Sequence, residues 1–293
     1  MLLLVPLIGG FYGWTCARGP RFLESWPAPG PNFTDWKEVT PGLSYSRANL
    51  SEPRPLKCHA LRIDLQHPEI EVVAAARPEA VDWFTSAWPS SLLRSEGLLA
   101  VINATPFQPE PYLPGPLVKP DGLVVMNGWA VAGPSGNLDA LIQSKNGTWS
   151  LQIGQREASD AKLAVGGFLV TVASGENRGE RHPQDAATAV GLSADRRWMY
   201  WLVVDGRQPG YSEGLTPKES AELLKGLGAA DAINFDGGGS TAMVLAGGWT
   251  GARVVNRPRS PVISGFQRPV ACVLGVRRRS DGGSGVGEPG RAN

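Results

Sequence analysis

Three consecutive glycines between polar side chains are the feature of this sequence that most directly suggests chemistry. The run reads Asn234-Phe235-Asp236-Gly237-Gly238-Gly239-Ser240-Thr241. Glycine allows positive φ angles and a close approach of backbone to a ligand, and successive N–H groups in such a loop can hold an anion. There is no Gly-Lys-Ser/Thr, so this is not the phosphate loop of a nucleotide-binding protein. Because a hairpin turn needs fewer such residues, we predict a ligand site at this segment.

Three further polar positions are candidates for the same site. Asp205-Gly206-Arg207 follows an apolar run; Asp-Gly is a common turn pair, and Arg207 fits either a bidentate phosphate contact or a surface ion pair. Glu219 is already explained by a helix cap, yet it can also face the site. Asn103 follows another apolar run and is either a substrate contact or a turn residue.

The elements that must position these residues can be read from three short apolar runs. The runs end at Asn103, Asp205 and Asp236 and are typical of strands buried on both faces. Between the last two, Thr216-Pro-Lys-Glu219 predicts the start of a helix that Gly228 ends. Strand, helix and strand in this order predict a crossover with parallel strands, which would bring Asp205 and Asp236 to one sheet edge.

The expected fold class is therefore α+β, with a mixed, partly parallel sheet and flanking helices. Residues 56–76 predict two more strands, joined by a turn at 66–68. The 293 residues can bury a full core, and 28 basic against 27 acidic side chains give a net charge of +1, so nucleic acid is not an expected partner. The spacing of three Cys and three His argues against a Cys/His zinc site, and no Gly-x-Ser-x-Gly elbow is present.

The ends of the chain predict export. Residues 1–16 read as a signal segment, 17–41 as a Pro-rich linker, 42–278 as the folded domain and 279–293 as a disordered tail. We expect a periplasmic or secreted protein with no stable membrane span after signal removal; a lipid on Cys16 is the minor alternative. Cys58 and Cys272 fit equally a disulfide and two buried free thiols in neighbouring strands.

Several motifs together resemble the phosphodiester glycosidase family, which includes an animal α-N-acetylglucosaminidase acting on N-acetylglucosamine-1-phosphodiesters and bacterial exopolysaccharide-related proteins. The resemblance covers roughly residues 56–276 and is most specific over 205–244. It implies a hydrolase that releases a sugar from a sugar-1-phosphodiester in exported polysaccharide or glycoconjugate metabolism. The motifs, in order, are NATPF, GLVVMNG, TAVGL, VVDGR, GLTPKESAELLKGLGAADAINFDGGGSTAMV and RPVACVLGV.

The resemblance, together with the chemistry of the reaction that it implies, gives expected roles. Asp236 and Asp205 would be the catalytic carboxylates, with Glu219 as a second acid/base candidate, and no cofactor is expected. Ala187 stands where the family commonly has Arg, so Arg181, Arg207 or another group must hold the phosphate, or the substrate differs. The expected substrate-binding residues are Asn103, Arg207, Asn234, Gly237, Gly238, Gly239, Ser240 and Thr241.

Two other functions compete with this one. The first is a non-catalytic polysaccharide-binding or export protein that uses the same site. The second is a metal-dependent phosphodiesterase in which Asp205, Asp236 and Glu219 hold a divalent cation through oxygen ligands.

Overall fold

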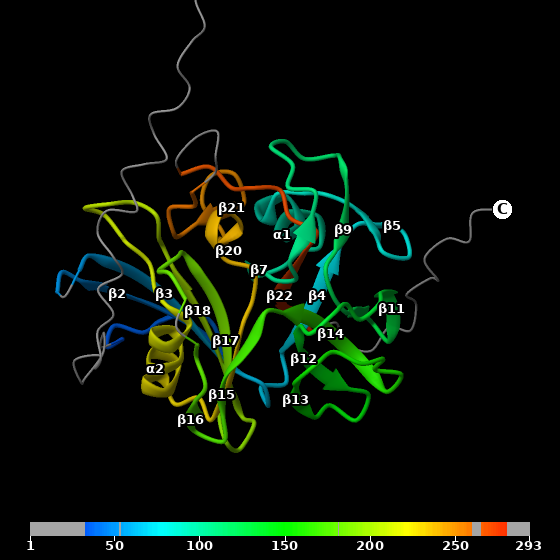
Figure 1. Cartoon of the computed structure of the whole chain (residues 1–293), viewed down its shortest axis with the longest axis horizontal. Helices are drawn as coiled ribbons and strands as arrows, with labels where there is room; N and C mark the ends of the chain where they lie inside the picture. Colours follow the sequence, from blue (N-terminus) through cyan, green and yellow to red (C-terminus); the bar gives the residue numbers. More distant parts are fainter. Residues whose placement is uncertain (1–32, 53, 181, 260–264, 280–293) are drawn as a thin grey trace, which may run out of the picture.

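The computed structural model describes residues 33–52, 54–180, 182–259 and 265–279. This part is built mainly from β-strands, with two α-helices, α1 (Pro89–Ser95) and α2 (Pro217–Leu227) (Figure 1). The predicted signal segment, most of the Pro-rich linker, Arg181 and nearly all of the predicted tail lie outside the described residues. No helix in the described ranges is long and apolar enough to cross a membrane.

The largest sheet has eight strands in the order β1-β2-β3-β18-β17-β19-β15-β16. Its first strand falls within residues 17–41, the range expected to be a linker. The bounds are β1 Lys37–Thr40, β2 Leu43–Leu50, β3 Leu56–Asp64, β15 Leu169–Ala173, β16 Glu176–Asn177, β17 Ala187–Leu192, β18 Trp198–Val204 and β19 Asp231–Asn234.

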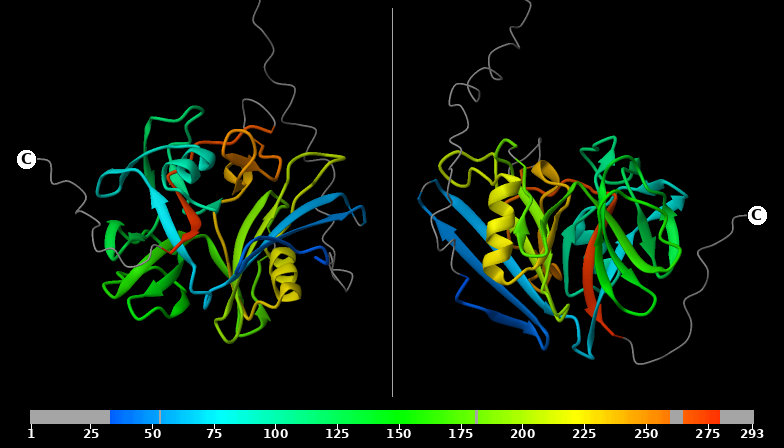
Figure 2. Two further views of the ribbon diagram at one scale, coloured as in Figure 1. Left: turned by 180° about the vertical axis from the view of Figure 1, so that it is seen from behind. Right: turned by 60° about the horizontal axis from the view of Figure 1, so that its bottom comes forward.

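A five-stranded sheet, ordered β21-β20-β7-β22-β4, contributes the other residues that surround the glycine-rich segment. Its strands are β4 Ile70–Ala76, β7 Ala100–Asn103, β20 Met243–Ala246, β21 Ala252–Val254 and β22 Cys272–Arg278. Leu61, Trp201 and Ile233 of the eight-stranded sheet share one hydrophobic core with Ile102 and Leu274 of this sheet. Figure 2 shows the two groups of strands from two further sides.

Two further sheets, one of five strands and one of four, complete the described part. One is ordered β11-β10-β14-β12-β13 and the other β5-β6-β9-β8. Their strands are β5 Pro78–Ala80, β6 Trp83–Thr85, β8 Phe107–Gln108, β9 Leu117–Pro120, β10 Val124–Met126, β11 Trp129–Ala132, β12 Asp139–Ser144, β13 Trp149–Gln152 and β14 Ala161–Gly167.

Helix α2 covers the other face of the eight-stranded sheet, where Leu224 packs in a second core with Ala189 and Ala232. The predicted capping box is confirmed. Thr216 Oγ1 accepts from the Glu219 N–H at 3.2 Å, and Glu219 Oε2 accepts from the Thr216 N–H at 2.9 Å. Gly228 ends the helix with φ of 108°, a left-handed conformation that glycine adopts without strain.

The predicted α+β class with a mixed, partly parallel sheet is wrong, because the described part is mainly β-strand and its paired strands run antiparallel. β18 and β19 both pair antiparallel with β17, so they run in the same direction but with a strand between them. The apolar runs were interpreted as parallel strands because they are buried on both faces. Here an antiparallel sheet is covered on both faces, by the core and by α2. Since β18 and β19 share a direction, Asp205 and Asp236 still follow strand ends at one edge of the sheet.

The two cysteines of the described part are free thiols, and both are buried. Cys58 lies in β3 of the eight-stranded sheet, whereas Cys272 lies in β22 of the five-stranded sheet. They are therefore not in neighbouring strands.

Candidate active site

The glycine-rich segment crosses from one sheet to the other. It leaves β19 of the eight-stranded sheet, forms a short 3₁₀ turn over Gly238–Ser240 and enters β20 of the five-stranded sheet. Two backbone hydrogen bonds fix its start: the Asp236 N–H donates to the Ala104 carbonyl at 3.0 Å, and the Gly238 N–H donates to the Ala186 carbonyl at 2.9 Å. We call residues 236–242 the crossing loop.

Asn103 fastens both ends of the crossing loop. Its Nδ2 donates to the main-chain carbonyl of Asp236 at 2.6 Å, and its Oδ1 accepts from the Ala242 N–H at 3.1 Å. Oδ1 also accepts from Thr188 Oγ1 at 2.7 Å, and the residue is fully buried. Asn103 is therefore placed to position Asp236 through the backbone rather than to meet a ligand in solvent.

The three glycines let other groups approach the loop. A Cβ on Gly237 would lie 2.6 Å from the Ala186 carbonyl oxygen. A Cβ on Gly238 would lie 2.7 Å from Nη2 of Arg207, and one on Gly239 would lie 2.6 Å from Nη2 of Arg268. Gly238 also has φ of +55°. The glycines thus bring two guanidinium groups directly against the loop.

Each of these arginines has an acidic partner. Arg207 makes a bidentate pair with Asp185, with Nε–Oδ1 at 2.6 Å and Nη2–Oδ2 at 2.5 Å. Arg268 Nη1 lies 2.8 Å from Glu110 Oε2. The Gly238 and Ser240 N–H groups bond to the carbonyls of Ala186 and Gly237. Positive charge at this loop therefore comes from the guanidinium groups rather than from those two amides.

Asp236 lies beside these charges and is intermediate between buried and exposed as a residue. Burial against the protein raises its pKa from 3.8 to about 7, and the negative charge of Glu110 acts in the same direction. The Ser240 hydroxyl and the positive charge of Arg268 partly oppose that rise. A carboxyl that titrates near neutral pH is suited to exchange a proton with a substrate or with water.

Asp205 lies in a different environment. It is almost completely buried, and its carboxylate accepts from the Arg257 N–H at 2.9 and 3.0 Å and from Asn256 Nδ2 at 3.0 Å. Burial raises its pKa, and the hydrogen bonds from Arg257 and Asn256 counteract that rise. These contacts tie the residues after β18, including Arg207, to the segment after β21.

The side chains of Glu219 and Asn234 make contacts at helix α2 and its N-terminal cap. Besides its capping bonds, Glu219 Oε2 lies 2.5 Å from Arg54 Nη2, and both side chains are buried. Asn234 Oδ1 accepts from Ser220 Oγ at 3.1 Å. Thr241 is buried, and its hydroxyl has no hydrogen-bond partner in the described part of the chain. The structure thus brings Asp236, Arg207 and the glycines together, while Glu219 and Asn234 contact α2 and its cap.

Sequence reasoning missed three residues of the site. Arg268 is the first residue of the RPVACVLGV motif, and this motif is the sequence signal that could have identified it. Asp185 forms an isolated β-bridge with Leu215 and Glu110 lies in a loop, and neither residue belongs to a motif.

Asp205, Asp236 and Glu219 do not form the oxygen-ligand cluster that the metal-dependent alternative requires. Across the residues that the structure describes, no three His, Cys, Asp or Glu side chains are placed to hold a metal ion.

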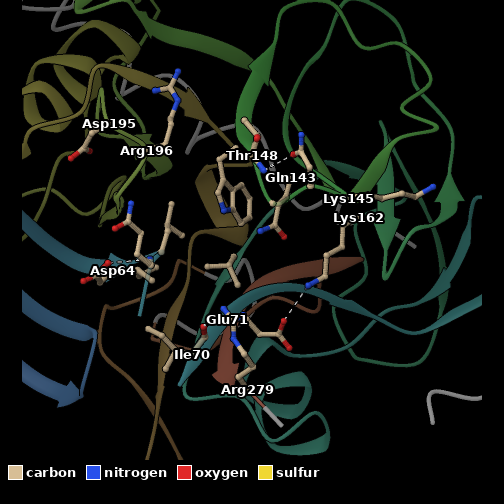
Figure 3. Close-up of a pocket in the computed structure, with 17 residues that line it drawn as sticks. Asp64, Ile70, Glu71, Gln143, Lys145, Thr148, Lys162, Asp195, Arg196 and Arg279 are labelled. Carbon is tan, nitrogen blue, oxygen red and sulfur yellow. Dashed lines mark hydrogen bonds and ion pairs between the residues drawn. The ribbon is translucent and has the colours of Figure 1, made fainter. Parts of the chain in front are cut away.

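A cavity of about 460 Å³ lies away from these residues (Figure 3). Its lining includes Asp195 and Arg196, which precede β18, whereas Asp205 follows the opposite end of that strand. Its charged side chains are largely paired, for example Lys162 with Glu71 at 3.3 Å. The cavity therefore does not belong to the Asp236 site.

Comparison with solved structures supports the fold. The catalytic domain of zebrafish N-acetylglucosamine-1-phosphodiester α-N-acetylglucosaminidase, auto-inhibited by its pro-peptide, matches with a TM-score of 0.63 at 18% identity, over 85% of this chain and 88% of that one. A hypothetical protein from Synechocystis matches with a TM-score of 0.60 at 15% identity, over 86% and 65%. A candidate exported protein from Burkholderia pseudomallei K96243 matches with a TM-score of 0.55 at 16% identity, over 76% and 74%.

The sequence comparisons place the chain in a family. No curated protein sequence matches it significantly. The family model for phosphodiester glycosidases matches residues 96–277, which is more than half of the chain and includes β7, α2 and the crossing loop. The chain therefore belongs to the phosphodiester glycosidase family.

Proposed function

We propose that this protein hydrolyses a sugar-1-phosphodiester, releasing the sugar and leaving the phosphate on the second group. The observation that carries the proposal is the arrangement at the crossing loop. The Asp236 carboxyl, with a pKa of about 7, lies close to the charges of two arginines, and the glycines allow both arginines to approach the same loop. This carboxyl and these two arginines together would hold a substrate that carries an anionic group beside its reacting carbon.

Asp236 is the acid/base group in this proposal. Water attacks the anomeric carbon, the bond from that carbon to the phosphate oxygen breaks, and the bonding electrons stay on the phosphate. Because phosphate is a good leaving group, its oxygen needs little protonation. Ionised Asp236 then accepts the proton of the attacking water and stabilises the positive charge that develops on the sugar.

Arg207 and Arg268 hold the phosphate. Guanidinium groups bind phosphate oxygens through paired N–H donors, and their charge stabilises the additional negative charge of the departing phosphate. Asn103 and Asp205 act as positioning residues, the first through the crossing loop and the second through the segment that carries Arg207. Among the other expected groups, Ser240 adjoins the Asp236 carboxyl.

The exported setting is part of the proposal. The N-terminal apolar segment predicts a signal, and one solved structure of similar fold is described as a candidate exported protein. We therefore propose that the substrate is an extracytoplasmic glycan or glycoconjugate.

The test is hydrolysis of UDP-N-acetylglucosamine by wild type, Asp236→Asn and the control Asp160→Asn, with both products identified. Asp160 is exposed and lies outside the site. We expect free sugar from wild type and the control but not from Asp236→Asn, and a wild-type kcat/KM that rises with pH through about 7. Sugar-1-phosphate as product would show cleavage within the pyrophosphate and refute the glycosidase reaction.

A further inference from the structure

The Glu110–Arg268 ion pair is unequal in its exposure. The Arg268 side chain is 11% exposed and packs against Gly239, whereas Glu110 is 52% exposed. Glu110 lies in the segment between β8 and β9, close to Tyr112 and Leu113, which are also exposed. Glu110 can therefore turn into solvent, while Arg268 stays beside the crossing loop.

Arg268 is incompletely satisfied by this partner. Glu110 takes Nη1, but Nε is buried and has no hydrogen-bond partner among the described residues. A buried donor without a partner is unfavourable. An incoming anion with several acceptor oxygens could satisfy the guanidinium more fully than the single Glu110 oxygen does, provided that the head group turns toward it.

Resting on the proposed function, we propose that Glu110 occupies Arg268 in place of the substrate phosphate and gives it up when the phosphodiester binds. The exchange replaces one anion beside Arg268 with another, so the charge around Asp236 changes little. In the free protein Glu110 thus acts as an internal substitute for the substrate anion, and it selects for ligands that carry a charge strong enough to displace it.

Direct anion binding tests this exchange without turnover. Inorganic phosphate is titrated calorimetrically at one pH and ionic strength into wild type, Glu110→Gln and the exposed control Glu157→Gln. Because a pair with an exposed partner is weak, we expect Glu110→Gln to tighten phosphate binding about two- to fivefold, while Glu157→Gln leaves it unchanged. Unchanged or weaker binding in Glu110→Gln would overturn the proposal.

A double variant separates exchange at Arg268 from general repulsion by Glu110. If the two anions compete for Arg268, Glu110→Gln tightens binding in the wild-type background but not in Arg268→Gln. Equal tightening in both backgrounds would overturn the exchange. Equal phosphate binding by wild type and Arg268→Gln would instead refute Arg268 as a phosphate ligand, which is a failure of the proposed function itself.

The pH dependence of turnover gives an independent readout. Because the charge of Glu110 raises the pKa of Asp236, Glu110→Gln should shift the kcat/KM profile, which reports the free enzyme, to lower pH. The kcat profile reports the complex, in which phosphate has replaced Glu110, and should stay in place. Equal shifts of both profiles would contradict the exchange.

Discussion

Replacing Asp236 with asparagine should stabilise the folded protein above neutral pH while removing its activity. The unfolded chain releases the Asp236 proton near pH 3.8, whereas the folded protein keeps it until about pH 7. The folded state therefore binds more protons in between, and wild type loses stability as the pH rises from about 4 to about 7. Asparagine has the same shape as the protonated form and does not ionise.

The magnitude follows from the gap of about three pH units between the two pKa values. At about 1.4 kcal/mol per unit the ionised carboxylate costs about 4 kcal/mol. Because Asp236 is intermediate between buried and exposed as a residue, solvent screening reduces this, and we expect Asp236→Asn to be more stable than wild type by about 2–4 kcal/mol at pH 8. At pH 4 the two proteins should be nearly equal in stability.

Urea unfolding of both proteins at several values between pH 4 and pH 8.5 gives the difference in unfolding free energy directly. Titrating groups that the two proteins share cancel in that difference. A difference that does not depend on pH, or an Asp236→Asn variant less stable than wild type at pH 8, would refute the reasoning. The exposed control Asp160→Asn identifies any general effect of removing one carboxylate.

Four further substitutions have expected outcomes. Glu219→Gln should lower the unfolding free energy by about 3 kcal/mol, because it removes the buried carboxylate that Nη2 of Arg54 contacts. It should keep kcat of the folded protein within about twofold; a hundredfold loss of kcat would make Glu219 catalytic. Gly237→Ala should impair folding or activity, because the added Cβ would lie 2.6 Å from a backbone carbonyl oxygen. Gly226→Ala, whose Cβ would enter open space beside helix α2, should instead stabilise the protein by up to about 1 kcal/mol. Equal effects of the two substitutions on the urea midpoint would contradict this. Burial lowers the pKa of His59 from 6.5 to about 4. The unfolding free energy of wild type should therefore fall by about 3 kcal/mol more than that of His59→Gln between pH 6.5 and pH 4, as measured by unfolding at each pH. Equal decreases in the two proteins would exclude His59 as the cause.

Local signals in the sequence predicted the local structure well. Thr216, Glu219 and Gly228 specify the ends of α2 through interactions within a few residues, and the helix is found there. The strands that end near Asp205 and Asp236 were identified for the same reason, since an apolar run followed by a polar residue is a local pattern.

Pairing between distant segments could not be read in this way. β17 inserts between β18 and β19 although it precedes both in the chain. Arg268 and Glu110 meet across more than 150 positions of sequence, and no spacing rule connects them. Asp205 was expected to face a ligand, but its carboxylate binds Asn256 and Arg257, which only the tertiary fold brings near.

The crossing loop, which carries Asp236, joins the eight-stranded sheet to the five-stranded sheet that contains β20. Asn103 fixes both ends of the loop from a third strand, β7. The hairpins and loops at the outer edges, such as that between β10 and β11, can therefore change length or sequence without displacing the carboxylate. Relatives with low sequence identity can therefore keep the crossing loop in one place while the residues of these outer loops vary.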